Sequence, residues 1–469
     1  MSAAAPHAIT IRDPLWDTIR LDPSAVRIID SAAFQRLRYI RQLGLAHLVY
    51  PGATHTRFDH ALGVYHLAQR ALAILDEQGG ARVADPVERR LVALAALLHD
   101  IGHYPYSHAI EELEEARIPG HHEALVGRFL ADPEVRAALE SVAPDGPARI
   151  EALVRGRSTS PLQGLVSGSL DLDKIEYLKR DARFCGVPYG EVDVDRLLHS
   201  LVVVEEPGTG RPEVGVHEKG VAALESLLFA KYQMFRNVYW HHAVRAATVM
   251  YKRIVGDALD GGLIRADELV GRTDEALLFL LETRAAATAE AGSGSGVAAD
   301  GARGGGGASV DPAAAARVGR WVGMLRARRL PKRVAEVAGA EVDGGDVGEW
   351  LAADTPLKRQ VEDRIAQELG LRPGDVFLDY PEKPAMFGLD LLVQRQSGRV
   401  IRLGPAGEPG LIGLPRVADE LYRTARVLRL FALGGRREVD PAVLAGVAAL
   451  GESEARRRLA DATALLGSG

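Results

Sequence analysis

The chain has 469 residues, of which 47% are hydrophobic and 26% are charged, and it contains one cysteine. This composition is typical of a folded globular protein and excludes a collagen-like, disordered or disulfide-stapled chain. The net charge of −6 disfavours a nucleic-acid backbone as the main partner, although a local arginine cluster can still bind an anionic small molecule. The single Cys185 excludes an internal disulfide and a cysteine-based zinc site.

The first residues lack the basic and apolar regions of a signal peptide, and the longest apolar stretch is Leu91–Leu98. Because a membrane span needs ~20 apolar residues, we expect a cytoplasmic protein without a membrane segment.

Apolar periodicity predicts that the first part of the chain is mainly α-helical. The expected helices cover Ser31–Leu43, Arg57–Leu72, Pro86–His99, His122–Leu130, Pro147–Arg155, Leu172–Asp181, Val216–Arg236 and Trp240–Ala258. Alternating patterns predict one small hairpin, formed by Leu201–Glu205 and Glu213–His217.

A Gly-, Ala- and Ser-rich stretch from Ala289 to Ala316 is typical of a flexible insert or linker. After it, short strands are expected at Asp375–Leu378, Leu391–Gln394 and Val400–Leu403, with a helix over Leu414–Phe431. The predicted organisation is a helical catalytic domain over 1–288, a linker over 289–316 and a smaller C-terminal α+β region over 317–469.

Histidines are concentrated in the first half of the chain, which holds His55, His60, His66, His99, His103, His108, His121 and His122. His99 and Asp100 end an apolar helix side by side, where an imidazole and a carboxylate can ligate one divalent cation. His60 and Asp173 are candidates for the remaining ligands. Two His and two Asp leave positions open for water and substrate. The alternative is a hydrogen-bonded helix end without a metal.

The order of these residues resembles the HD phosphohydrolase superfamily, in which a histidine, a His-Asp pair and a later aspartate bind the metal. The segments Phe34–Gly44, Tyr50–His60 and Leu172–Asp181 resemble its dNTP triphosphohydrolase branch. The resemblance runs from about Ile11 to Tyr251, and more loosely through Leu325–Ala335 and Asp375–Pro384. It implies a mainly α fold, an HD-domain helical bundle with a smaller C-terminal α+β region.

The same resemblance implies metal-dependent hydrolysis of a dNTP to a deoxynucleoside and inorganic triphosphate, with water attacking the α-phosphorus. His60, His99, Asp100 and Asp173 would bind one divalent ion, either Mg, Mn, Fe, Co or Zn, and further Mg would arrive with the nucleotide. Arg57 and Lys174 would contact the phosphates, where cations stabilise the charge of the transition state.

Acid–base roles also follow from the resemblance. His108 matches a general acid for the leaving 5′-oxygen, and His103 lies one helical turn after His99. His122 and Glu111 match a pair in which a carboxylate orients an imidazole. Because the segment between them is lengthened, His121 is an alternative partner, and exposed loop histidines without a role are another.

Substrate-binding positions carry over as well. Gln42 and Asp181 match residues that hold the 3′-hydroxyl, and Tyr177 matches an aromatic packed on the deoxyribose, with ordinary helix packing as the alternative. The expected substrate-binding set is completed by Leu43, Lys231, Phe235 and Tyr239. Lysine 231 and phenylalanine 235 differ from some members, which leaves the preferred base open.

Asp30, Gln35 and Arg38 match a site that binds a regulatory guanine nucleotide between subunits of an active tetramer. The alternative is that Arg36, Arg38 and Arg41 form a solvated helix face. The resemblance therefore implies a homo-oligomer, a dimer or tetramer, with a nucleotide substrate and a second activating nucleotide as partners.

Two other functions remain open from the sequence. One is another HD chemistry, such as hydrolysis of a guanosine alarmone or a phosphodiester, with the same metal ligands. The other is a nucleotide-sensing or nucleic-acid-binding protein with little turnover. Gln42, Tyr177 and Asp181 favour the deoxyribose substrate over both.

Overall fold

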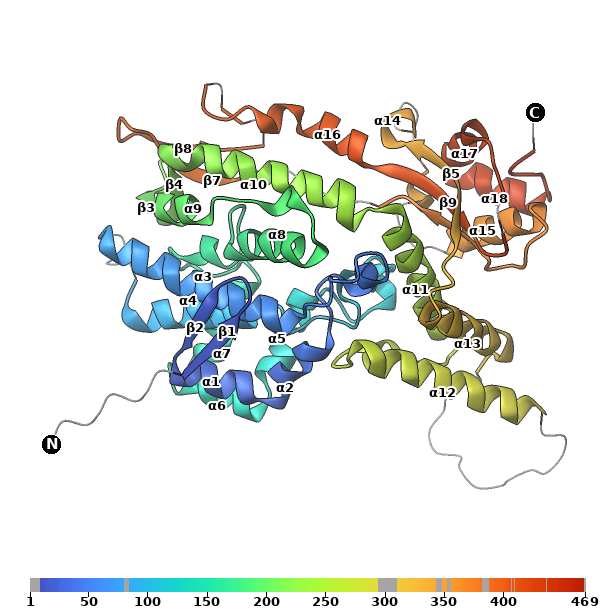
Figure 1. The fold of residues 1–469 in the computed structure, drawn as a ribbon, viewed down its shortest axis with the longest axis horizontal. Helices are drawn as coiled ribbons and strands as arrows, with labels where there is room; N and C mark the ends of the chain where they lie inside the picture. The colour runs from blue at the N-terminus through green and yellow to red at the C-terminus, as the bar shows by residue number, and fades with distance from the viewer. Residues whose placement is uncertain are drawn as a thin grey trace.

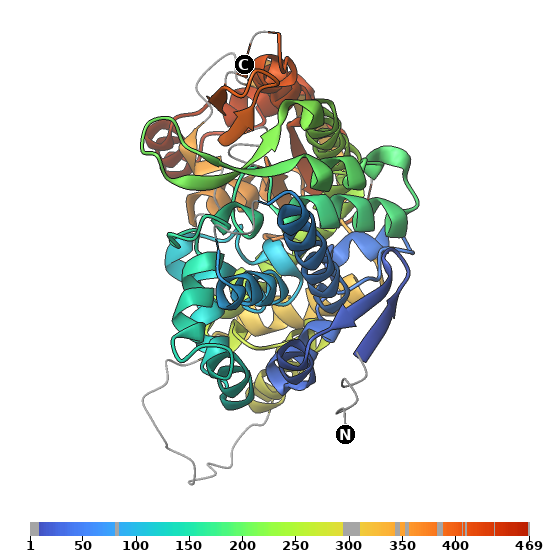
Figure 2. The same ribbon diagram turned by 90° about the vertical axis from the view of Figure 1, so that its left-hand side faces the viewer.

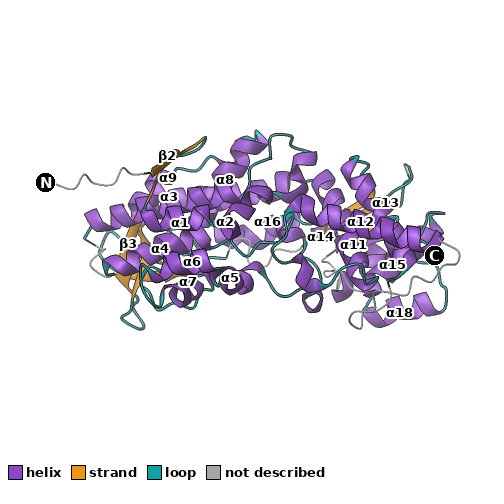
Figure 3. Cartoon of the chain, turned by 90° about the horizontal axis from the view of Figure 1, so that it is seen from below, coloured by secondary structure: helices purple, strands orange, loops and turns teal. Residues whose placement is uncertain are grey.

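The computed structural model describes residues 9–79, 84–293, 310–342, 348–351, 356–381, 388–405, 407–408, 410–435 and 437–467. Helices dominate this part of the chain, and the strands lie in three small sheets among them (Figures 1 and 3). The fold is therefore mainly α with a smaller α+β part, as the sequence predicts. None of its helices is long and apolar enough to cross a membrane, among the residues described.

The helices of the first part lie close together (Figure 2). All but the last of them contribute to one apolar core, and the last contributes to a second. They are α1 (Pro23–Asp30), α2 (Ala32–Gln35), α3 (Arg57–Glu77), α4 (Pro86–Leu98), α5 (His122–Leu130), α6 (Pro133–Glu140), α7 (Gly146–Val154), α8 (Leu172–Cys185), α9 (Val194–Ser200), α10 (Val221–Met234) and α11 (His242–Asp260).

Local sequence explains where the three site-bearing helices begin. Helix α3 begins with a capping box in which Thr56 and Asp59 satisfy each other's backbone amides. Helix α4 begins with Asp85 as N-cap and a proline at its first position, and Leu91–Leu98 are all buried. Helix α8 begins with the Asp171 side chain accepting from the Lys174 amide.

The later elements are α12 (Asp274–Ser293), α13 (Pro312–Arg326), α14 (Gly339–Val342), α15 (Pro356–Glu368), α16 (Ala418–Ala425), α17 (Pro441–Ala448) and α18 (Glu452–Ala460). Helices α12 and α13 extend into both ends of the predicted linker, whose residues 294–309 lie outside the described part.

The strands are β1 (Ile9–Asp13), β2 (Asp17–Leu21), β3 (Leu201–Glu205), β4 (Pro212–His217), β5 (Lys332–Ala338), β6 (Val376–Asp379), β7 (Leu391–Gln394), β8 (Val400–Leu403) and β9 (Val427–Ala432). They form the sheets β1-β2, β3-β4-β7-β8 and β5-β9-β6. The predicted hairpin becomes β3-β4, and β7 joins it in parallel through the pairs Gly215↔Leu392 and Val216↔Val393. Residues late in the chain therefore complete a sheet of the first part.

Three predicted helices differ from the structure. The helix over Ser31–Leu43 is replaced by α2 and a 3₁₀ turn ending at Tyr39, after which Ile40 is extended and Arg41 pairs with Thr56. The helix over Val216–Arg236 starts only at Val221, because the preceding residues form β4.

The predicted helix over Leu414–Phe431 ends at Ala425, and Val427–Ala432 form β9 instead. Strand β9 is the central strand of its sheet, with partners on both sides and mostly buried side chains. A short apolar run of this kind has no periodicity that separates a buried strand from a buried helix.

Candidate active site

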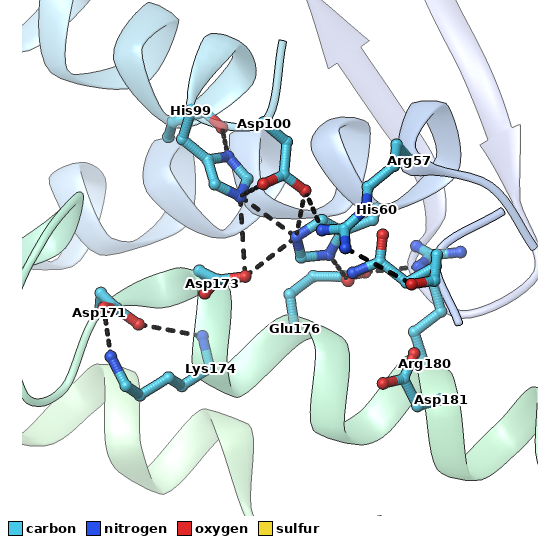
Figure 4. A network of polar contacts seen from close by, with 12 residues as sticks. Arg57, His60, His99, Asp100, Asp171, Asp173, Lys174, Glu176, Arg180 and Asp181 are labelled. Carbon is cyan, nitrogen blue, oxygen red and sulfur yellow. Dashed lines mark hydrogen bonds and ion pairs between the residues drawn. The ribbon is translucent and has the colours of Figure 1, made fainter. Parts of the chain in front are cut away.

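Four predicted metal ligands meet where α3, α4 and α8 come together (Figure 4). His60 Nε2 lies 3.2 Å from His99 Nε2, and Asp173 Oδ1 lies 3.0 Å from the former and 3.6 Å from the latter. The ligand atoms of these three residues are close enough to hold one ion. Asp100 borders them, with its carboxylate oxygens 3.5 Å from His60 Nε2 and 3.4 Å from His99 Nε2.

Both histidines are held with Nε2 turned toward this point. His60 Nδ1 donates to Glu176 Oε2 at 2.6 Å, and His99 Nδ1 donates to the Ala96 carbonyl at 2.8 Å. A proton on each Nδ1 leaves the lone pair of each Nε2 available to a cation, the arrangement that metal-ligating histidines require. The donor set therefore fits a divalent metal.

Glu176 is itself fixed from two other directions. Its Oε1 accepts from Trp16 Nε1 at 2.9 Å and from Arg180 Nε at 2.7 Å, and all of its side chain is buried. Gly63 in α3 makes room for it, because a Cβ at that position would collide with the Glu176 carboxylate. This second layer holds the His60 ring in one orientation.

The charge around His60 favours a cation. Burial lowers the pKa of this imidazole, but Asp173, Glu176 and Asp100 outweigh burial and raise the pKa to about 10. A cluster of carboxylates that binds a proton this strongly also stabilises a metal ion, which would replace the proton.

Arg57 connects the metal ligands to the neighbouring loop. Its guanidinium donates to Asp100 Oδ2 at 2.6 Å, and its Nε donates to Ser107 Oγ at 3.0 Å. Its remaining nitrogen reaches the Gln42 carbonyl at 3.4 Å. Lys174, the other predicted phosphate contact, donates to the Gly168 carbonyl and pairs with Asp171. Both cations are thus held beside the predicted ligands.

Three of the four predicted metal ligands line a cavity of about 1130 Å³. Its walls contain His99, Asp100 and Asp173 and every predicted substrate-binding residue, namely Gln42, Leu43, Arg57, Lys174, Tyr177, Asp181, Lys231, Phe235 and Tyr239. The late part of the chain contributes Lys358, Asp379 and Tyr380. Residues spread over most of the sequence therefore face one space.

A second group of histidines lies beside the metal ligands. Glu111 accepts from His122 Nδ1 at 2.7 Å through one oxygen and from His108 Nδ1 at 2.8 Å through the other. The His103 ring stacks on His122 with centroids 3.8 Å apart. Burial raises the pKa of Glu111, but His122 and His108 outweigh it and hold the pKa well below its ordinary value. The carboxylate is therefore charged and orients both rings.

The geometry distinguishes the two candidate partners of Glu111. His121 Nδ1 lies 4.0 Å from Glu111 Oε1, beyond hydrogen-bonding distance, and its side chain is 55% exposed. His122 contacts the same oxygen through both its ring and its backbone amide. The side chains of His103, His108, Glu111 and His122 are also close enough to hold an ion together.

Strained backbone presents His108 to the cavity. Tyr106 and Ser107 both have left-handed conformations, with φ of 55° and 56°, which cost about 1–3 kcal/mol each. Asp274 accepts from the Tyr106 amide at 2.6 Å, and Ser107 Oγ donates to the Arg41 carbonyl at 2.9 Å. These contacts hold the strained turn in place.

The predicted sugar-binding residues lie together at another part of the cavity wall. Asp181 accepts from Tyr239 Oη at 2.7 Å and from His55 Nε2 at 2.7 Å. Gln42 is buried, and its Oε1 has no hydrogen-bond partner among the described residues. Tyr177 and Tyr239 have ring centroids 6.5 Å apart. Phe235–Tyr239 form a π-helical turn, a feature frequent at functional sites.

Several predicted residues lie away from the cavity wall. His60 and His103 are buried behind it. Asp30, Gln35 and Arg38 lie outside it, where Arg38 donates to Gln35 Oε1 at 2.8 Å and covers the Phe58 ring. The alternative of a solvated helix face formed by Arg36, Arg38 and Arg41 is wrong for Arg36. This side chain is buried and donates to the carbonyls of Ile101 and His103.

Three residues that support the site were not predicted from the sequence: His55, Glu176 and Arg180. Glu176 follows Asp173 by three residues, and this helical spacing places both on the metal side of α8, which is a signal that the sequence contains. Arg180 lies one turn further and pairs with Asp13 as well as Glu176. The partnership of His55 and Asp181 joins residues 126 positions apart, and no local pattern predicts it.

Comparison with known families agrees with this geometry. Residues 57–155 match the HD domain, and residues 192–293 and 312–407 match the HD associated region. These matches together cover more than half of the chain, which belongs to the HD superfamily.

The chain spans about half or less of the length of the relatives that it matches. An uncharacterised protein of Methanocaldococcus jannaschii is 36% identical over 272 residues, 58% of this chain and 54% of the relative. The deoxynucleoside triphosphate triphosphohydrolase SAMHD1 of Homo sapiens is 29% identical over 277 residues, 49% of this chain and 41% of the relative. The Xenopus laevis SAMHD1 is 46% identical over 99 residues, 21% of this chain and 16% of the relative.

Solved structures match over more of the chain. A hypothetical protein from Aquifex aeolicus has a TM-score of 0.62 at 26% identity, covering 91% of this chain and 96% of the other. A phosphohydrolase from Bacteroides thetaiotaomicron has a TM-score of 0.65 at 21% identity, covering 91% of this chain and 100% of the other, which shows a shared fold.

Proposed function

We propose that the chain is a metal-dependent phosphohydrolase that converts a dNTP to a deoxynucleoside and inorganic triphosphate. One observation carries the proposal: three of the four candidate metal ligands, a carboxylate-oriented histidine pair and the residues matched to the deoxyribose all face one cavity, with His60 directly behind its wall. The similarity to enzymes named deoxynucleoside triphosphate triphosphohydrolases supports this substrate class.

In this proposal His60, His99, Asp100 and Asp173 hold one divalent ion. When bound, such an ion polarises a phosphoryl oxygen and lowers the pKa of a coordinated water. Arg57 and Lys174 lie beside the ligands and face the cavity, where their charges stabilise the phosphates. These ligands accept several divalent ions.

The reaction breaks the bond between the α-phosphorus and the 5′-oxygen as water adds to phosphorus. His108 donates the proton that the departing 5′-oxygen requires, and Glu111 holds the imidazole in place through Nδ1. His122 and Glu111 would form the acid–base pair, since the same carboxylate also orients the His122 ring through Nδ1. General acid catalysis of this kind contributes about 10²–10⁴-fold to a rate.

Gln42 and Asp181 would recognise the 3′-hydroxyl, and Tyr177 would pack on the sugar. The buried Gln42 Oε1 has no partner among the described residues and is free to accept from a hydroxyl. A site built to hydrogen-bond one hydroxyl rejects an analogue without it, because its polar groups are then buried without partners. This sugar subsite supports a deoxynucleotide over an alarmone or a simple phosphodiester.

The test is a product assay on the purified protein. Each of the four dNTPs and several rNTPs is incubated with Mg²⁺ or Mn²⁺, and the products are separated by chromatography. We expect deoxynucleoside plus triphosphate. Release of only orthophosphate or pyrophosphate rejects the proposal, and binding without turnover indicates a nucleotide sensor.

Regulation is a separate part of the proposal. Asp30, Gln35 and Arg38 would bind a guanine nucleotide that promotes an active homo-oligomer. Gel filtration and rate measurements with and without GTP or dGTP test this idea, and the absence of an effect on both assembly and rate rejects it.

A further inference from the structure

His55 links the two residues assigned to the sugar hydroxyl. Its ring Nε2 lies 2.7 Å from Asp181 Oδ1, and its backbone carbonyl accepts from the Gln42 amide at 3.0 Å. His55 and Asp181 are 2% and 1% exposed, so their hydrogen bond is shielded from solvent. His55 lies within the resembling segment Tyr50–His60, but the resemblance gives it no role, and it does not line the cavity.

Asp181 is held at both of its oxygens. His55 donates to Oδ1 and Tyr239 donates to Oδ2, each at 2.7 Å. A carboxylate has about four acceptor positions, so two of them remain for a ligand hydroxyl. The two donors fix the plane of the carboxylate and so the direction in which those positions point.

The His55 ring has one hydrogen-bond partner among the described residues, the Asp181 carboxylate. Its ring lies against Phe184 with centroids 4.6 Å apart, and its Nδ1 has no hydrogen-bond partner within the described part of the chain. Because Nε2 faces a carboxylate oxygen, Nε2 carries the proton that it donates to Asp181. This hydrogen bond forms whether or not Nδ1 has a partner. The ring therefore acts on Asp181 through one nitrogen.

We propose that His55 is the positioning residue of the 3′-hydroxyl subsite: it aligns Asp181 through its ring and Gln42 through its carbonyl. This inference rests on the proposed dNTP substrate. His55 itself does not touch the substrate, since it does not line the cavity. Its ring should therefore affect recognition of the 3′-hydroxyl and leave the rest of nucleotide binding unchanged.

The experiment compares the dNTP that is turned over fastest with its 2′,3′-dideoxy counterpart. For each variant, kcat/KM is measured on the dNTP, and the inhibition constant of the dideoxy compound is measured against it. The variants are His55→Leu, which removes the donor, and His55→Gln, whose amide can reach the same carboxylate. Phe184→Leu is the matched control, because it changes the ring packing and leaves the hydrogen bond.

We expect His55→Leu to lower kcat/KM on the dNTP about 10-fold or more, mainly through KM, with the dideoxy inhibition constant unchanged. His55→Gln should restore most of the loss, and Phe184→Leu should resemble the wild type. Equal losses for both compounds overturn the inference, as they indicate a general structural role. The inference is also overturned if His55→Leu still prefers the dNTP over the dideoxy compound as strongly as the wild type does.

Failure of the proposed function gives a different result. If the wild type hydrolyses dNTPs but binds the dideoxy compound equally well, the sugar subsite is assigned wrongly and His55 has no such role. If the wild type hydrolyses no dNTP, the proposed function fails before any variant is compared.

Discussion

The Nε2 atoms of His60 and His99 lie 3.2 Å apart, although the two residues belong to different helices 39 positions apart in the chain. The Nδ1–H group of each ring donates to an oxygen, of Glu176 for His60 and of Ala96 for His99. The lone pairs of the two Nε2 atoms therefore point toward the same place. Two imidazole lone pairs repel each other unless a proton or a metal lies between them. This pair is therefore the part of the site that most directly requires a cation.

Asp173→Ala should remove bound metal and abolish turnover, because Asp173 Oδ1 lies within reach of both of these nitrogens. Elemental analysis of purified protein measures the first effect. In the wild type, free metal at 100 times its Kd should stabilise the fold by about 2.7 kcal/mol, which thermal denaturation detects. A variant that keeps its metal contradicts the assignment.

Glu176→Gln should weaken metal binding by about 10–100-fold while the ligands remain in place, because Glu176 holds the His60 ring without facing the ion. Competition with a chelator measures this change. Saturating metal should restore much of the activity in this variant, in contrast with Asp173→Ala. Unchanged affinity would mean that the contact with His60 does not orient the ligand.

His108→Ala should keep the metal and lose about 10²–10⁴-fold in kcat, since His108 is the proposed general acid and is not among the candidate ligands around His60. Single-turnover rates and metal content are measured on the same sample. His121→Ala is the control, because its ring lies 4.0 Å from Glu111. A fully active His108→Ala contradicts the general acid assignment.

Arg245→Met should destabilise the fold by about 3–5 kcal/mol. Arg245 is buried and donates to Asp379 and Glu112, so that its loss leaves the buried Asp379 without its closest partner. Urea denaturation gives the free energy of unfolding. Arg457→Met serves as the control, since Arg457 is 65% exposed and solvent screens its pair with Glu454.

Glu112 should contribute to acid sensitivity. Burial raises the pKa of Glu112, but Arg245 and Lys252 outweigh it and hold the pKa well below its ordinary value. A carboxyl with a lowered pKa stabilises the folded state above its unfolded pKa of about 4.3, and this contribution is lost as pH falls below that value. With a metal chelator present, the free energy of unfolding of Glu112→Gln should therefore depend less on pH in the acid range than that of the wild type. An unchanged acid slope would contradict this expectation.

The sequence by itself determined the helices that carry the site. The capping residues Thr56, Asp85 and Asp171 are local signals, and the helices of the HD region begin where these signals place them. The His-Asp pair and its two distant partners could also be chosen from the sequence, because their residue types and order resemble the pattern of the HD superfamily.

Only the tertiary structure decided which residues hold that site in shape. His55 reaches Asp181, Glu176 reaches His60, and Arg245 connects Glu112 to Asp379. The tertiary structure also decided that Val427–Ala432 form the central strand of a sheet. These outcomes depend on burial against segments far away in the chain, and a short apolar run or a single polar residue contains no local signal of its distant partner.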